Sequence, residues 1–187
     1  MVTNNKKFDV RKLTYLAIFS ALVFVFQVMA IPVGGFFETS ALPVAVIVIG
    51  AALFGIKGGA WLGFVFGIAV MILPGTQVYL TFGDNAVYST FCTVAVVFVK
   101  GILAGASAGA VFKLLNRFNR YFAVLASGIA AVTVNTGMFI LGSVLFFEAS
   151  LAAMMTIALL ISYVIELGAS ILLAPIALRV INIKNKV

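Results

Sequence analysis

The stretch Lys100-Gly-Ile-Leu-Ala-Gly-Ala-Ser-Ala-Gly109 lies within a run from about residue 86 to residue 115 that is otherwise almost wholly apolar. Gly101, Gly105 and Gly109 recur every four residues, so on an α-helix they form a stripe along which another helix can approach closely. Lys100 lies beside that stripe. A lysine so far from either end of a lipid-spanning helix costs at least about 2.5–3.5 kcal/mol, so its side chain is expected to face the protein interior and a partner.

The composition around this stretch is that of a polytopic membrane protein. Of the 187 residues, 64% are hydrophobic and only 9% are charged, whereas charged residues make up about 25% of a soluble domain. The mean hydropathy of +1.26 points the same way. We therefore expect an all-α integral membrane protein whose single domain covers residues 1–187. The net charge of +7 does not indicate nucleic-acid binding, because nearly all of the cations lie in the gaps between apolar runs.

Six apolar segments approach the length of about 20 residues that crosses a bilayer. They lie near residues 12–31, 41–55, 58–74, 87–115, 120–147 and 151–179. The second and third are short and separated only by residues 54–58, which predicts a helical hairpin with a glycine turn. The first apolar run is longer than the ~7–15 residues of a signal-peptide core, so we expect it to be retained as a helix.

The Lys and Arg residues at or beyond the ends of the segments fall on one side of a six-span arrangement. They lie at the two termini and in the second and fourth gaps, and Lys100 is the one cation of the twelve outside this pattern. The opposite side carries Glu38, Asp84 and Glu148 instead. The excess of cations predicts that both termini are cytoplasmic.

Two of the loops on the other, outer side mix glycine, aromatic rings and uncharged hydrogen-bonding groups, as expected of loops that cover a small polar ligand. They span residues 32–40 and 74–85. The ligand-binding candidates in these loops are Phe36, Phe37, Gln77, Tyr79 and Asn85. For the two phenylalanines, an aromatic belt at the membrane interface is an equally good interpretation.

A second charge lies within an apolar segment, at Glu166. Lys100 precedes the cytoplasmic Lys113 by thirteen residues, and Glu166 precedes Arg179 by the same number. Since both helices run from outside to inside, the two charges are predicted to lie at similar depth and to form an interhelical pair. The pair is either structural or the floor of a cavity. Alternatively, Lys100 meets a ligand carboxylate while Glu166 accepts a ligand hydroxyl.

Two further polar side chains extend this candidate pocket. Asn135 lies about eleven residues from the outer end of its segment, and Tyr163 lies one turn outward of Glu166. An asparagine in hydrocarbon is poorly tolerated unless it is hydrogen-bonded, so Asn135 must bond another helix or a ligand. Together with Lys100, these groups predict a pocket that opens outward.

The sequence contains no recognisable catalytic motif. It has no phosphate-binding Gly-x-x-x-x-Gly-Lys-Ser/Thr loop, no Gly-x-Ser-x-Gly elbow, no His-Glu-x-x-His site and no paired carboxylates. With no histidine and only Cys92, it offers neither a metal framework nor a disulfide, and we expect no metal and no cofactor. These features favour a binding subunit that is not an enzyme and takes its energy from elsewhere.

Two motifs resemble a known family. Ala17-Ile-Phe-Ser-Ala21 lies in the first segment, and Ile49-Gly-Ala-Ala-Leu-Phe-Gly-Ile-Lys-Gly-Gly-Ala-Trp-Leu-Gly-Phe-Val-Phe-Gly67 runs from the second segment into the third. With six spans and both ends inside, the chain resembles the S components, the substrate-binding subunits of energy-coupling factor (ECF) vitamin transporters.

The resemblance implies a subunit in the plasma membrane of a bacterium that captures a vitamin from outside with high affinity. It also implies association with a membrane coupling subunit and two cytoplasmic ATPases, which would hydrolyse ATP. In that family the small-residue face of the first helix meets the coupling subunit, which here implies Ala17 and Ala21. Family ligands lie near the outer surface, among the last three spans and the outer loops.

The resemblance is greatest to pantothenate-type members. Lys100-Gly101 and Asn135-Thr136 ahead of Phe139 match their pattern, and Lys100 is the one intramembrane cation available to the pantothenate carboxylate. Riboflavin, folate and hydroxymethylpyrimidine remain alternatives. Two other functions also remain open, namely a stand-alone facilitator and, from a different class, a structural or assembly membrane protein that binds no ligand.

Overall fold

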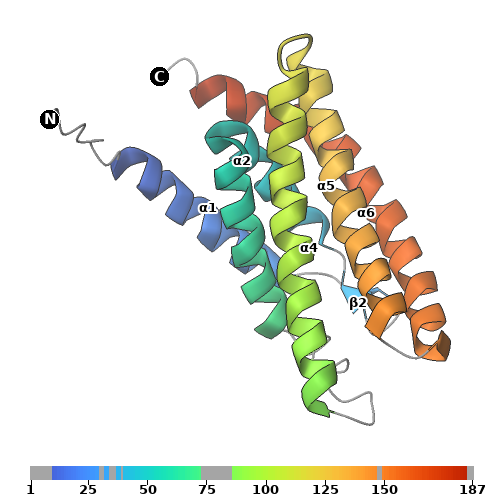
Figure 1. Cartoon of the computed structure of the whole chain (residues 1–187). Helices are drawn as coiled ribbons and strands as arrows, with labels where there is room; N and C mark the ends of the chain where they lie inside the picture. The colour runs from blue at the N-terminus through green and yellow to red at the C-terminus, as the bar shows by residue number, and fades with distance from the viewer. Residues whose placement is uncertain are drawn as a thin grey trace, which may run out of the picture.

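The computed structural model describes residues 10–29, 32–33, 37–38, 40–72, 86–146 and 149–184. Apart from a two-stranded antiparallel ribbon, these residues are helical, as the composition predicts (Figure 1). The elements are α1 (Val10–Val28), β1 (Pro32–Val33), β2 (Phe37–Glu38), α2 (Ala41–Ile72), α4 (Ala86–Leu115), α5 (Arg120–Phe146) and α6 (Ala149–Lys184). Each of the five helices contains a stretch that is long and apolar enough to cross a membrane.

The helix α2 is broken at Gly55, where φ is 76° and ψ is −169°. This backbone conformation is accessible to glycine and strained for other residues. Beyond the break, the chain folds back on itself. Two contacts show this: Gly50 packs against Leu62, and a Cβ on Gly59 would lie 2.9 Å from the Cβ of Ala51. In one continuous helix, Gly50 and Leu62 would be about 18 Å apart. The glycine turn expected over residues 54–58 is therefore concentrated in a single residue.

One helical segment is shorter than a bilayer-spanning helix, and two helix ends differ by three or more residues from those expected. The first arm of α2, residues 41–54, is about 21 Å long, which is shorter than the ~30 Å hydrocarbon core of a bilayer. The helix α1 ends at Val28 rather than at residue 31. The helix α6 continues past residue 179 to Lys184, because Ile181 is buried and Arg120 Nη1 donates a hydrogen bond of 2.7 Å to Asn182 Oδ1.

The second arm of α2 and the helix α4 pack through their glycines, which confirms the close approach predicted from the small-residue stripe. Gly63 faces the carbonyl oxygen of Gly101, and Gly59 faces that of Gly105. A Cβ on any of these four residues would collide with the opposite backbone. The two helices therefore touch backbone to backbone, which maximises van der Waals contact where lipid supplies no hydrophobic attraction.

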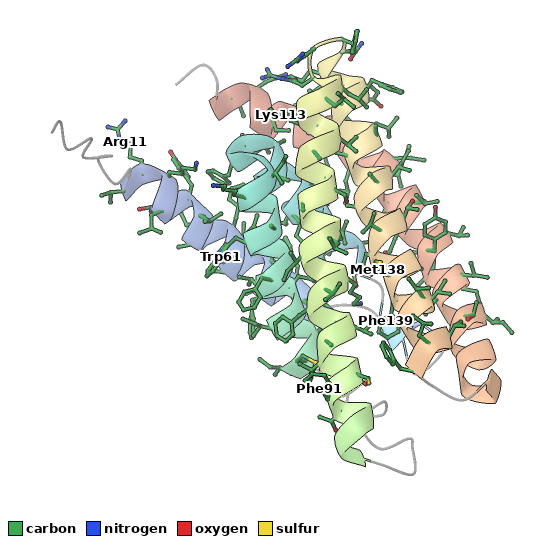
Figure 2. The ribbon with its side chains drawn as sticks, viewed as in Figure 1. Arg11, Trp61, Phe91, Lys113, Met138 and Phe139 are labelled. Carbon is green, nitrogen blue, oxygen red and sulfur yellow. The ribbon has the colours of Figure 1, made fainter. Side chains whose placement is uncertain are left out.

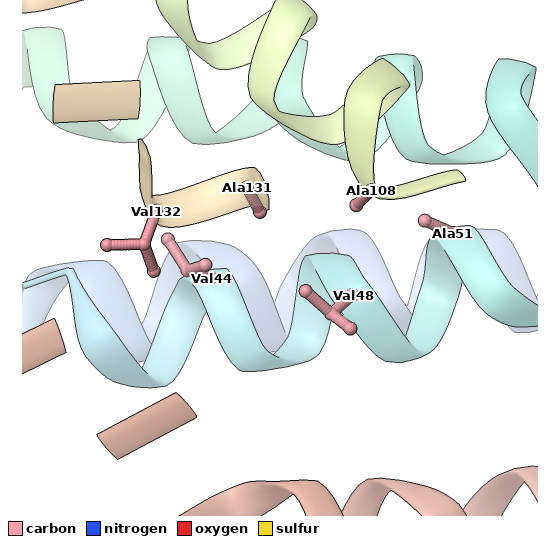
Figure 3. Packing of buried hydrophobic residues seen from close by; sticks show 6 residues of the cluster. All are labelled: Val44, Val48, Ala51, Ala108, Ala131 and Val132. Atoms are coloured by element: carbon pink, nitrogen blue, oxygen red, sulfur yellow. The ribbon is translucent and has the colours of Figure 1, made fainter. Parts of the chain in front are cut away.

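Small side chains also let three helices meet at the centre of the bundle (Figure 3). There α2, α4 and α5 contribute a buried cluster of Val44, Val48, Ala51, Ala108, Ala131 and Val132. The helix α1 is more peripheral, since only Val23 and Gln27 of its side chains are buried. It is held to α2 by a hydrogen bond of 3.2 Å from Trp61 Nε1 to Ser20 Oγ, among other contacts.

Candidate functional site

The ammonium group of Lys100 lies inside the bundle between aromatic rings. Its side chain is 8% exposed, and Nζ lies 4.5 Å from the ring centroid of Phe139 on α5 and 5.6 Å from that of Phe66 on α2. Figure 2 shows Phe139 well removed from the end of α4 that carries Lys113. A cation–π contact contributes roughly 0.5–2 kcal/mol, which is less than the several kcal/mol that burying an ion costs. The site therefore suits a ligand that supplies negative charge.

The carboxylate of Glu166 is buried nearby at 3% exposure. Its Oε1 accepts a hydrogen bond of 2.8 Å from the backbone N–H of Ser40, the residue before α2. The charges of Lys100 and Glu166 interact through the interior, but among the described residues they do not form the direct ion pair expected from their depth. Glu166 turns one oxygen to the start of α2, and Lys100 turns to the aromatic rings.

Several oxygen atoms buried in the described part of the chain have no hydrogen-bond partner there. They are Gln27 Oε1, Thr93 Oγ1, Asn135 Oδ1, Ser162 Oγ and Glu166 Oε2. Buried polar groups in native proteins are nearly always hydrogen-bonded, and leaving one unpaired costs about 1–3 kcal/mol. The bundle that buries the Lys100 ammonium therefore also buries oxygen atoms that could accept hydrogen bonds from a polar ligand.

Contacts between α5 and α6 show which of these atoms lie at the same level. The hydroxyls of Thr133 and Tyr163 are hydrogen-bonded at 3.1 Å. Seven residues further along α6, Ser170 contacts α5, because a Cβ on Gly128 would lie 3.3 Å from the Cβ of Ser170. In this antiparallel register, Asn135 lies opposite Ser162. Glu166 is one turn further along α6, so the unpaired oxygens of Asn135, Ser162 and Glu166 lie within about one helical turn of each other along the bundle, whereas Gln27 lies on α1 and Thr93 on α4.

The structure thus places three of the residues predicted from the sequence, Lys100, Asn135 and Glu166, in the bundle interior. Tyr163 is half-buried and its hydroxyl is engaged by Thr133. The loop residues Phe36, Gln77, Tyr79 and Asn85 lie outside the described residues, as does the side chain of Phe37.

Sequence reasoning missed several groups at this site. They are Ser40, Phe66 and Ser162, with Gln27 and Thr93 as further buried polar groups of the bundle, and Phe139 was used only as part of a motif. A helical-face argument could have found two of them, because Ser162 lies four residues before Glu166 and Thr93 lies seven before Lys100.

A shallow hollow elsewhere in the bundle does not match this chemistry. It lies between α2, α5 and α6, and Ser170 is its one polar lining residue among alanine, valine, leucine and glycine. The described residues include no group of three or more His, Cys, Asp or Glu side chains placed to hold a metal ion.

Comparison with known proteins adds one finding. A family model described as "ECF transporter, substrate-specific component" matches residues 11–181, which is nearly the whole chain. The curated proteins include none that matches the chain.

Proposed function

We propose that this protein captures pantothenate from outside a bacterial plasma membrane. The chain belongs to the family of ECF transporter substrate-specific components. Members of this family are multi-pass membrane subunits that bind a small molecule and are not enzymes. The observation that carries the proposal is the buried Lys100 ammonium, which faces aromatic rings and has no direct carboxylate contact among the described residues. A ligand carboxylate would supply the missing negative charge.

The hydrogen-bonding groups of pantothenate suit the rest of the site. The molecule has one carboxylate, two hydroxyls and an amide N–H, and the unpaired buried atoms include acceptors such as Asn135 Oδ1 and Glu166 Oε2. Riboflavin and hydroxymethylpyrimidine have no carboxylate for Lys100. Folate has two carboxylates and is much larger. The site therefore favours pantothenate among the vitamins considered.

A binding assay on the purified protein tests this function. Radiolabelled pantothenate is equilibrated with the protein in lipid nanodiscs, and unlabelled riboflavin, folate and hydroxymethylpyrimidine are added as competitors. We expect one pantothenate per chain, displaced by unlabelled pantothenate but not by the other three. Displacement by one of those three would reassign the substrate, and a protein that bound none of the four would contradict the capture function.

The proposed topology has six spans, with the two arms of α2 counted separately, and both termini in the cytoplasm. Figure 2 supports it, because Arg11 on α1 and Lys113 on α4 lie toward the same end of the bundle, whereas Phe91 lies toward the other. Cations gather on the cytoplasmic side of membrane proteins. In this topology, Lys100 lies between the cationic, cytoplasmic end of the bundle and the outer end near Phe91, and the proposed site opens toward that outer end.

We also propose that α1 docks on the coupling subunit, which works with two cytoplasmic ATPases. Ala17 and Ala21 are exposed, one turn apart on α1, where small residues allow another helix to approach closely.

The double variant Ala17→Leu with Ala21→Leu is expected to lower ATP-dependent uptake at least tenfold in vesicles containing the ECF module, with pantothenate binding unchanged. Ala110→Leu, at an exposed alanine of α4, is the matched control and should take up substrate normally. Equal uptake by the double variant and the control would contradict docking through this face.

A further inference from the structure

The helix α2 begins at a buried residue, Ser40, whose polar groups are removed from water. Ser40 is 6% exposed, and its carbonyl accepts a hydrogen bond of 3.0 Å from the N–H of Val44, which makes it the N-cap residue. Its own N–H has no acceptor within the helix and instead donates to Glu166 Oε1 at 2.8 Å. A carboxylate at this position also interacts favourably with the positive end of the helix dipole.

The second oxygen of the same carboxylate is not used in this way. Glu166 Oε2 is buried and unpaired, as are Asn135 Oδ1 and Ser162 Oγ on the facing surfaces of α5 and α6. If the role of Glu166 were only to cap α2, the desolvation cost of the second oxygen would be offset only by the longer-range attraction to Lys100, with no hydrogen bond. An isosteric glutamine would hold Ser40 equally well, without a buried charge.

We propose that Glu166 is a divided carboxylate, in which Oε1 fixes the start of α2 and Oε2, with Asn135 Oδ1, accepts hydrogen bonds from donor groups of the captured ligand. The inference rests on the proposed capture function and adds a requirement on the chemical groups of the ligand. The ligand must present donors to Glu166 and Asn135 in addition to a carboxylate for Lys100. The same side chain then links the ligand to the start of α2.

The variant Glu166→Gln separates the two roles. The glutamine oxygen can still accept the Ser40 N–H, while its NH₂ group replaces Oε2 and is a donor rather than an acceptor. We expect unchanged thermal stability and unchanged protection of the Ser40 amide from hydrogen exchange, together with at least tenfold weaker pantothenate binding. Glu166→Leu removes both roles, so it should also speed exchange at Ser40 and lower the melting temperature.

Ser170→Ala serves as the control on α6, one turn from Glu166 and facing Gly128 rather than the unpaired oxygens; its binding should equal that of the wild type. Equal binding by the wild type and Glu166→Gln would overturn the ligand half of the inference and leave the capture function standing. Unchanged Ser40 exchange in Glu166→Leu would overturn the structural half. If the wild type itself bound no pantothenate, the proposed function and the ligand half would both be overturned.

Discussion

Replacing Lys100 by methionine is expected to weaken pantothenate binding about 30-fold or more while the bundle keeps its stability. Removing one partner of a buried charge pair costs roughly 2–5 kcal/mol of binding free energy. The ammonium is buried among aromatic rings without a direct carboxylate contact in the described part of the chain. The variant loses the cation–π contacts and the longer-range attraction to Glu166, but it also removes the cost of burying the ammonium, so the free energy of unfolding should change little while ligand binding is lost. Isothermal titration and thermal unfolding of both proteins measure the two effects.

Panthenol, in which a CH₂OH group replaces the pantothenate carboxylate, is the matched control ligand. The wild type should bind panthenol much more weakly than pantothenate, whereas Lys100→Met should bind the two about equally. The four affinities form a thermodynamic cycle whose coupling energy isolates the contact between the ammonium and the carboxylate. If the variant still preferred pantothenate as strongly as the wild type does, Lys100 would not be the carboxylate-binding group.

The largest stability effect is expected from Gly63→Val. The Cβ of the new side chain would collide with the backbone carbonyl of Gly101, and a backbone atom cannot move aside as a flexible side chain can. Overpacking of this kind costs typically 1–3 kcal/mol, and we expect about 3 kcal/mol here because α2 and α4 must separate along their whole glycine contact. Thermal unfolding followed by the fluorescence of Trp61 measures the change.

Gly137→Ala is the control for this substitution. A Cβ at Gly137 meets no atom within 4 Å, and alanine is favoured over glycine in a helix by up to about 1 kcal/mol. The control should be as stable as the wild type or slightly more stable. If Gly63→Val unfolded at the same temperature as Gly137→Ala, the close contact between α2 and α4 would be refuted.

The features that could be predicted from the sequence are those set by local spacing and by the cost of burying polar groups in lipid. Gly101 and Gly105 recur at helical spacing, and the structure places both against glycines of α2. Lys100, Asn135 and Glu166 stand out because hydrocarbon tolerates such side chains poorly, and all three prove to be buried. These predictions needed no knowledge of how the helices are arranged.

The features that escaped prediction depend on that arrangement. The bond from Ser40 to Glu166 joins residues 126 positions apart, and it depends on where the start of α2 packs against α6. Pairing Lys100 with Glu166 from their depth alone overlooked the Ser40 N–H, which occupies one carboxylate oxygen, and the aromatic rings beside the ammonium. Ser162 and Thr93 were missed because a hydroxyl in a helix normally bonds a carbonyl of the preceding turn and so gives no signal of its own.

Native mass spectrometry of the protein purified from its host membrane tests the central claim most directly. Any small molecule that the protein retains is released and identified by its fragments. The account predicts one pantothenate per chain in the wild type and none in Lys100→Met prepared in the same way. A wild-type protein that carries no small molecule, and that gains no thermal stability when pantothenate, riboflavin, folate or hydroxymethylpyrimidine is added, would contradict it and make Lys100, Asn135 and Glu166 packing residues alone.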